Sequence, residues 1–289
     1  MRGLVLIGLA AVSWGTTGSV TAVLVSRAWA GPLVIGAVRM VIAAALLVVV
    51  ARGVAGSLRI DPRDRWRCVA LGVCLAAFQA TYLSAVTLIG IAVAALIAIC
   101  CAPLLIAGLA ATVLGERITA RVGGALALGV AGTALLIVGP RTAADVSARF
   151  VAGVLLALGA SLAYAVYVVL AKATLARTAP LPLAAANFTV AALVLTPALA
   201  GADVGRQLAL GWPWMLYLGA VTTAGAYAIY TIGLRAVPAS VAGIAALMEP
   251  LTATLLGVWL FGERLGAAGV AGAVLLIAAL GLLVTRDTA

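Results

Sequence analysis

The sequence contains no histidine, and only 9% of its 289 residues are charged. It also lacks the Gly-x-Ser-x-Gly segment that presents a serine nucleophile and the Gly-x-x-x-x-Gly-Lys loop that binds nucleotide phosphates. No two acidic residues share a long apolar run, where they could ligate a metal or act as an acid–base pair. We therefore expect no catalytic residue, no metal and no cofactor. These absences argue against an intramembrane enzyme and against a pump that hydrolyses ATP.

What the sequence has in abundance is apolar residues, which make up 66% of the chain and give it a mean hydropathy of +1.28. A water-soluble domain of this length cannot bury so much apolar surface, so we predict an integral membrane protein. Inside a bilayer the backbone must pair its own polar groups, as helices or as a closed barrel. The apolar runs are too long and too continuous for barrel strands. The predicted fold class is therefore all-α.

Ten membrane-spanning helices are predicted, at about 20 residues for each crossing. Five fall in each half, so that residues 1–141 form one five-helix repeat and residues 150–286 form a second. The first apolar run has no convincing cleavage site, and we interpret it as a retained helix rather than a signal peptide. The predicted spans are 3–25, 31–51, 68–89, 92–114, 121–139, 151–171, 181–200, 212–234, 239–261 and 266–285.

The second half of the sequence repeats the first at a fixed offset. Pro103 and Pro250 stand 147 residues apart, and so do Glu116 and Glu263, each of which is the centre of a Gly-Glu-Arg triplet. An odd number of spans in each repeat makes the two halves enter the membrane in opposite senses. Inverted repeats of this kind allow a central site to open to either side in turn, which is the mechanism called alternating access.

Positive charge is distributed unevenly between the two sides of this predicted topology. If the N-terminus is cytoplasmic, twelve Arg or Lys residues lie on the cytoplasmic side and five on the other, with Arg39 inside a helix. Positive residues favour the cytoplasmic side, so both termini are predicted to lie in the cytoplasm of a bacterial cell, with the chain in the inner membrane. The net charge of +10 then reflects basic loops that face anionic lipids, and we expect no nucleic-acid partner.

Several motifs together resemble a known family. Ser13-Trp14-Gly15 lies in the first predicted helix, Arg39 in the second, and a proline followed by Gly-Glu-Arg closes each half. With its ten predicted spans, the chain resembles an EamA-type member of the drug/metabolite transporter superfamily. The resemblance implies a ten-helix fold, a central substrate cavity and export from the cytoplasm. Within the family the chain is most similar to bacterial amino-acid exporters, including the aromatic amino-acid type.

Two charged residues fall inside predicted helices, where charge is costly and a functional role is the default hypothesis. Glu249 could couple transport to protons or bind a substrate ammonium group. Alternatively, it could pair with Arg39 or cap backbone groups that Pro250 leaves free. Arg39 could grip a substrate carboxylate, or it could tie helix ends together, and for this residue we favour the structural role.

Aromatic and polar residues recur at spacings of three, four and seven along several predicted helices, which places each set on one helix face. Such faces would form an amphipathic pocket for a small zwitterion. Tyr217 and Tyr230 are interpreted instead as anchors at the membrane interface, with Tyr167 and Asn187 as reserve candidates for the pocket. The predicted substrate-binding residues are Trp14, Thr17, Gln79, Tyr82, Tyr164, Tyr227 and Glu249.

The repeated prolines are predicted to act as hinges or gates. Pro103 and Pro250 should each kink a helix near the middle of the membrane, because proline removes a helical hydrogen bond and clashes with the preceding turn. Closely spaced glycines in the fifth and tenth spans should let those two helices pack together. We expect a monomer, although the same glycines could serve a dimer contact.

The sequence thus predicts an exporter of small amphipathic metabolites, amino acids first and aromatic ones among them. The expected partners are that small-molecule substrate and the membrane lipids. Two alternatives stay open. One is a multidrug or lipid-linked-sugar carrier of the same fold, and the other is a membrane scaffold or sensor that transports nothing.

Overall fold

The computed structural model describes residues 1–27, 30–137, 147–261 and 266–284, and all regular structure in these ranges is helical. Gly262, Glu263 and Arg264 of the second repeated triplet lie outside the described residues. The first half contains α1 (Arg2–Gly15), α2 (Thr17–Ser26), α3 (Pro32–Ala55), the 3₁₀ turn η1 (Pro62–Asp64), α4 (Arg65–Ile89), α5 (Ile91–Val113) and α6 (Ala120–Ile137). The second half contains α7 (Ala148–Thr174), α8 (Pro180–Leu195), the 3₁₀ turn η2 (Thr196–Leu199), α9 (Val204–Gly219), the π-helical segment η3 (Ala220–Gly225), α10 (Ala226–Ala236), α11 (Ala239–Ala245), α12 (Met248–Phe261) and α13 (Ala267–Val284).

Nine helical stretches in the described ranges are long and apolar enough to cross a membrane. Each coincides with one of the ten predicted spans. The remaining prediction, 121–139, coincides with α6, whose apolar part covers the shorter range Ala120–Leu136. Residues 138 and 139 lie outside the described ranges, so the full length of that span stays a prediction. An all-helical membrane protein is thus confirmed.

Three of the predicted spans contain an interruption. The first is divided between α1 and α2 at Thr16, and the ninth is divided between α11 and α12 at residues 246–247. The eighth runs through α9, η3 and α10, with one π-helical segment in its middle. This span also begins at Val204 rather than at the predicted 212, because Asp203 caps its first turn by accepting a hydrogen bond from the Arg206 N–H (3.0 Å). The polar residues of that turn had suggested a loop.

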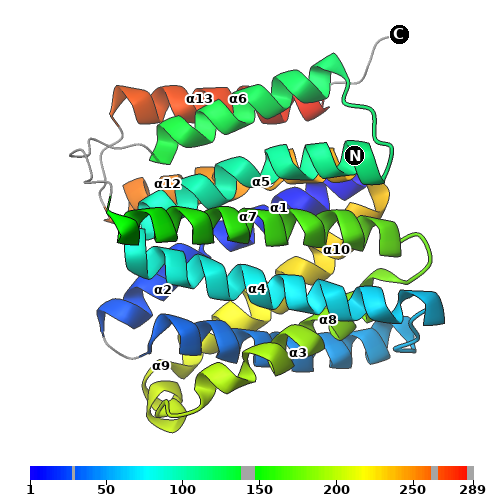
Figure 1. Cartoon of the computed structure of the whole chain (residues 1–289), viewed down its shortest axis with the longest axis vertical. Coiled ribbons are helices and arrows are strands. Elements are labelled where there is room, and N and C mark those ends of the chain that lie inside the picture. Colours follow the sequence, from blue (N-terminus) through cyan, green and yellow to red (C-terminus); the bar gives the residue numbers. More distant parts are fainter. Residues whose placement is uncertain (28–29, 138–146, 262–265, 285–289) are drawn as a thin grey trace.

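The helices lie side by side, from α6 and α13 at one end of the long axis to α3, α8 and α9 at the other (Figure 1). As expected from their glycines, α6 and α13 pack together along their length. Their backbones approach closely at Gly132 and Gly272, since a Cβ on Gly132 would lie 2.7 Å from the carbonyl oxygen of Gly272. The second and seventh spans, α3 and α8, also pack on each other. Helices that hold equivalent places in the two halves therefore contact one another.

The six other spans form two groups of three. In one group, α4, α5 and α7 run without interruption and contact one another, and we call this the continuous group. In the other, the α1–α2 pair and the α11–α12 pair contact each other, and α1 also packs against α10 and η3. All three spans with an interruption belong to this second set, which we call the interrupted group.

The start of α1 marks one end of the bundle, which we call the N-terminal end. Gly3 packs against Ala236, the last residue of α10, and Val284 at the end of α13 lines the same surface groove as Leu4. The first helix therefore begins where the last described helix ends.

Candidate functional site

Eight aromatic side chains from five helices make continuous ring contacts in the middle of the bundle. The Trp14 ring centroid lies 4.9 Å from that of Tyr227 and 5.1 Å from that of Tyr230. Phe188 also contacts Tyr227, with their centroids 4.8 Å apart. We call this set the aromatic cluster; its members are Trp14, Phe78, Tyr82, Tyr164, Tyr167, Phe188, Tyr227 and Tyr230.

All four aromatic residues predicted to bind substrate, Trp14, Tyr82, Tyr164 and Tyr227, belong to this cluster. Phe78 joins two of them, because its ring centroid lies 5.9 Å from that of Tyr82 and 5.5 Å from that of Tyr164. Tyr82 and Tyr164 are half-buried. The structure therefore brings the four predicted aromatic residues together, and part of the surface of two of them faces open space.

The interpretation of Tyr230 as an interfacial anchor is wrong. Its side chain is completely buried within the aromatic cluster, three residues after Tyr227 and on the same helix face. Tyr217 is half-buried, and its hydroxyl is hydrogen-bonded to the hydroxyl of Thr16 at the interruption of the first span (2.8 Å). The Tyr217 hydroxyl thus has a protein partner, and the Tyr230 hydroxyl is buried without a hydrogen-bond partner among the described residues.

Two members of the cluster, Phe78 and Phe188, were not predicted. Phe78 lies four residues before Tyr82, a spacing that places both on one face of α4, so periodicity could have identified it. Phe188 follows Asn187 on α8, and nothing in its local sequence distinguishes it from the other apolar residues of that helix.

Glu249 lies in the first turn of α12, directly after the interruption of the ninth span. The residue is half-buried, its carboxylate interacts electrostatically with Arg39, and it lies near three tyrosines of the aromatic cluster, namely Tyr82, Tyr164 and Tyr227. A Cβ on Gly15 would lie 2.8 Å from the backbone carbonyl oxygen of Glu249, so α1 passes directly beside this turn. The backbone of Glu249 therefore lies beside the end of α1, and its carboxylate lies near the aromatic cluster.

Arg39 is a half-buried residue of α3, and its Nε donates a hydrogen bond to the hydroxyl of Thr223 in η3 (3.1 Å). In the described part of the chain, no ion pair within 4.0 Å joins Arg39 to Glu249. The same ranges give the Glu249 carboxylate no hydrogen bond to backbone groups near Pro250. Arg39 and Glu249 are thus close enough to interact electrostatically but are not in direct contact.

Gln79 and Thr17 complete the set of predicted binding residues. Gln79 is buried one turn before Tyr82, and a Cβ on Gly36 of α3 would lie 2.9 Å from its Nε2. Thr17 is the first residue of α2, and its hydroxyl is a buried atom without a hydrogen-bond partner among the described residues. The Trp14 indole N–H is also buried and has no hydrogen-bond partner among the described residues. Unpaired polar atoms of this kind are available to a polar ligand or to water.

The two repeated prolines hold different positions. Pro103 lies inside α5, which continues through it to Val113. Pro250 lies in the first turn of α12, where a missing N–H costs no helical hydrogen bond, and the helix is interrupted just before it, at residues 246–247. The ninth span is thus interrupted within one turn of Pro250, whereas α5 is continuous at Pro103, and a role of either proline as a hinge or gate stays a prediction.

At the N-terminal end of the bundle, a buried carboxylate joins the two halves. Asp64 accepts hydrogen bonds from Arg177 (2.6 Å) and from the Thr178 hydroxyl (3.1 Å), and it also pairs with Arg67 (3.0 Å). The hydrogen bond to Asp64 raises the pKa of the Arg177 guanidinium, because the carboxylate stabilises its charged form.

A second carboxylate, Glu116 after α5, also joins the halves at this end. It accepts hydrogen bonds from the backbone N–H of Ala239 (2.6 Å) and of Ser240 (3.1 Å), and from the Ser240 hydroxyl (2.7 Å). Lys172 donates to the carbonyl oxygens of Leu234 (3.0 Å) and Arg235 (3.1 Å) nearby. The N-terminal end is therefore fastened by polar contacts.

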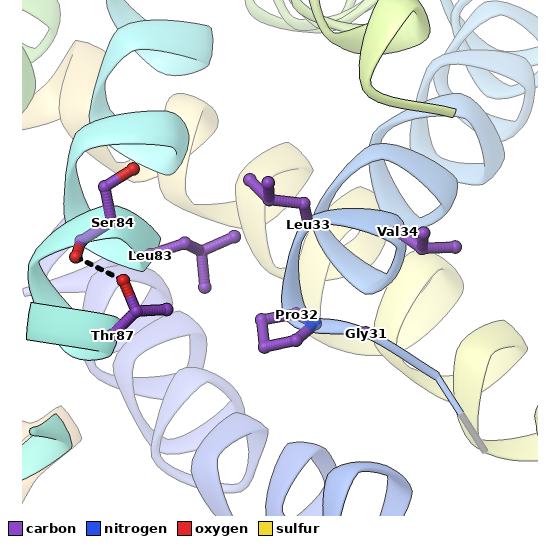
Figure 2. Close-up of a pocket in the computed structure, with 7 residues that line it drawn as sticks. All are labelled: Gly31, Pro32, Leu33, Val34, Leu83, Ser84 and Thr87. Atoms are coloured by element: carbon purple, nitrogen blue, oxygen red, sulfur yellow. Dashed lines mark hydrogen bonds between the residues drawn. The ribbon is translucent and has the colours of Figure 1, made fainter. Parts of the chain in front are cut away.

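The opposite end has an open pocket of about 270 Å³ between α3 and α4, shown in Figure 2. One wall is the start of α3, at residues 31–34, and the other is formed by Leu83, Ser84 and Thr87 near the end of α4. Leu83 lies between this pocket and the predicted site, since it packs against Gly36 beside Gln79. None of the predicted binding residues lines the pocket itself.

The geometry defines a class of protein. Long apolar helices, three of them interrupted near charged and aromatic side chains, are features of a multi-pass membrane transporter. Residues 1–138 and 151–285 match the EamA-like transporter family, and the chain belongs to that family. It is a transporter and not an enzyme.

Two relatives support this assignment. The chain is 37% identical over 278 residues to the "Uncharacterized transporter YwfM" of Bacillus subtilis, covering 96% of this chain and 90% of that one. It is 30% identical over 200 residues to an "Uncharacterized transporter" of Archaeoglobus fulgidus, with 69% of each chain covered. A solved crystal structure with 22% identity covers 97% of this chain and 96% of its own, with a TM-score of 0.80, and shows the same fold.

Proposed function

We propose that this transporter exports small amphipathic metabolites, with amino acids as the first candidates, from the bacterial cytoplasm across the inner membrane. The observation that carries the proposal is the pair Arg39 and Glu249, which can carry opposite charges, lie near the aromatic cluster and form no direct ion pair in the described ranges. Each charge is expensive in hydrocarbon unless something compensates it. A zwitterion supplies a carboxylate for one and an ammonium for the other, while the rings accommodate an apolar or aromatic side chain.

The packing supports alternating access between two inverted five-helix repeats. The equivalent helices α3 and α8 contact each other, as do α6 and α13, and the contact of α4 with α7 between the halves is matched by that of α10 with α1. A two-fold axis in the membrane plane produces this pattern of self-paired and exchanged contacts. The contact data thus favour ten spans, in which α6 is the fifth.

The two ends of the bundle differ in a way that fits one state of such a cycle. We assign the N-terminal end to the cytoplasm because it carries the basic segments around Arg67 and Arg177. Glu116 and Asp64 fasten that end by hydrogen bonds, whereas an open pocket lies between α3 and α4 at the other end (Figure 2). This difference supports an outward-facing conformation.

A flux screen in proteoliposomes tests the proposal. Purified protein is reconstituted and loaded in turn with radiolabelled amino acids, including phenylalanine and leucine, and with cationic dyes, and protein-free liposomes provide the background. We expect flux of at least one apolar or aromatic amino acid. Flux of dyes without any amino acid would instead establish a multidrug carrier, and no flux of any solute would favour a scaffold.

Glu249→Gln addresses the role of the carboxylate in the same assay. The substitution removes the negative charge but keeps the shape of the side chain, and we expect at least a tenfold loss of amino-acid flux with a normal elution profile. If Glu249 carries the coupling proton, the variant also loses the response of flux to a pH gradient and still binds substrate. Unchanged flux at every pH would remove Glu249 from the mechanism.

A further inference from the structure

The guanidinium of Arg39 is held at one of its nitrogens and open at the other two. Its Nε donates to the Thr223 hydroxyl at 3.1 Å, which uses one of the five N–H groups of the side chain. Among the described residues, the four N–H groups on Nη1 and Nη2 have no hydrogen-bond partner. Arg39 is half-buried, so part of this residue is exposed.

Thr223 is fixed as an acceptor toward Arg39 by its other hydrogen bond. Its hydroxyl donates to the carbonyl oxygen of Leu218, five residues earlier, at 2.7 Å. A threonine hydroxyl has a single proton, so only a lone pair remains for the Nε–H of Arg39. The direction of both bonds is therefore determined, and Thr223 cannot turn away without losing one of them.

The π-helical segment is what places this hydroxyl. In η3 the helix is widened by about one residue, which rotates the following residues by about 100° relative to a regular α-helix. Thr222 donates to the carbonyl of Leu218 four residues earlier (2.9 Å), as in a regular helix, whereas the bond of Thr223 to the same carbonyl spans five residues (2.7 Å), and only Thr223 contacts Arg39. Single π-helical turns inside α-helices are frequent at functional sites.

The open edge of Arg39 lies in the region already assigned to substrate. Its guanidinium is bonded to Thr223, which lies one turn before Tyr227 of the aromatic cluster, and it interacts electrostatically with Glu249. Two parallel N–H groups match the two oxygens of a carboxylate, which is the strongest arrangement available to arginine.

We propose that Thr223 is a positioning residue that occupies Nε of Arg39 and so directs the Nη1–Nη2 edge to bind the substrate carboxylate in a bidentate manner. The proposal deepens the proposed function and rests on it. It also decides between the two roles weighed for Arg39, because a purely structural cation would have its terminal nitrogens paired with protein groups.

Three variants separate this role from a structural one. Thr223→Val keeps the size of the side chain and removes the hydroxyl, while Thr223→Ser restores it. Thr222→Val is the matched control. Thr222 lies in the same segment and also donates to the carbonyl oxygen of Leu218, but it does not bond to Arg39. L-phenylalanine and L-phenylalaninamide serve as probes, because the amide keeps the ring and the ammonium and lacks the carboxylate.

We expect Thr223→Val to raise the half-saturating concentration of L-phenylalanine about tenfold with little change in maximal flux, because a hydrogen bond to a charged group is lost. Thr223→Ser and Thr222→Val should behave as the parent protein, and flux of the amide should not respond to any variant. Equal effects of Thr223→Val and Thr222→Val, or equal effects of Thr223→Val on the two probes, would overturn the proposal.

Thermal stabilisation of the purified protein gives a second measurement that does not require transport. L-phenylalanine should raise the melting temperature of the parent protein and of Thr222→Val, and much less that of Thr223→Val. If no solute is transported but this difference is found, the transport proposal fails and the carboxylate site stands. If flux of phenylalanine is normal and the variants melt alike with ligand, only the role of Thr223 fails.

Discussion

Each group combines spans from both halves, and by order in the chain the third, fourth and sixth spans of the continuous group correspond to the eighth, ninth and first of the interrupted group. Only the interrupted group contains irregular helices. In the fourth span α5 passes through Pro103 unbroken, whereas in the ninth span the helix stops before Glu249 and Pro250. In the third span α4 is regular, whereas the eighth contains η3 and Thr223. The interruptions thus coincide with Glu249, which can carry a charge, and with Thr223, which hydrogen-bonds to the charged side chain of Arg39. The charged residue Glu249 and the Arg39 partner Thr223 therefore lie at positions where the two sets of spans differ.

The largest loss of stability is expected from a larger side chain at Gly15, where the interrupted first span packs against the interrupted ninth span. A Cβ on Gly15 would lie 2.6 Å from Cβ of Thr252 and 2.8 Å from the carbonyl oxygen of Glu249. Gly15→Val should therefore destabilise the protein by about 3 kcal/mol, since overpacking a tight contact forces backbone shifts. A strongly lowered melting temperature in detergent would show it.

Gly18→Val is the matched control for that experiment. Gly18 lies in the same span, but a Cβ there would meet nothing within 4 Å. The control should melt like the parent protein. Equal melting temperatures for the two variants would mean that the interrupted spans do not depend on this close approach.

A smaller loss of stability is expected at Glu116, whose hydrogen bonds join the continuous group to the interrupted group. Glu116 follows α5 of the continuous group and caps the start of α11 in the interrupted group. Glu116→Gln removes the charge from these hydrogen bonds and should cost about 1 kcal/mol, as the loss of a helix cap does. The amides of Ala239 and Ser240 should then exchange hydrogen faster, which mass spectrometry of the peptide around residues 237–242 can measure.

Arg117→Ala provides the comparison for this measurement, because the neighbouring charge changes while Glu116 is kept. Its exchange rates should match those of the parent protein. Faster exchange in both variants would indicate that general loosening of the loop, rather than the carboxylate, controls the N-terminal end.

The smallest effect is expected within the continuous group. Ser161 of α7 donates to the carbonyl oxygen of Ala98 in α5 at 2.6 Å. Hydrogen bonds between membrane helices contribute about 0.6 kcal/mol on average, so Ser161→Ala should lower the melting temperature only slightly. Flux should be unchanged, because this contact holds two regular helices together away from Arg39 and Glu249. A large loss of flux without a loss of stability would contradict the division between the two groups.

Hydropathy and helical spacing were sufficient to predict the class of fold and most of the aromatic cluster. Both signals are local, since burial in lipid needs long apolar runs and a shared helix face needs spacings of three or four. The break before Glu249, the π-helical segment at Thr223 and the burial of Tyr230 were not predicted. Each of these three features depends on which helix packs against it. Gly15 of α1, for example, packs against the backbone of Glu249, and a single sequence does not show such a contact.

The pairing of α3 with α8 has a consequence for how a duplicated protein can evolve. Arg39 lies on α3, and Asn187, close to the equivalent position of the second half, is fully buried on α8. A dimer of identical halves would carry two arginines here, and a charge in the middle of a membrane costs about 2.5 to 3.5 kcal/mol on insertion scales. Joining the halves in one chain lets the second copy mutate alone to a neutral amide. Fusion thus allows a single positive charge where a symmetric ancestor would have to place two or none.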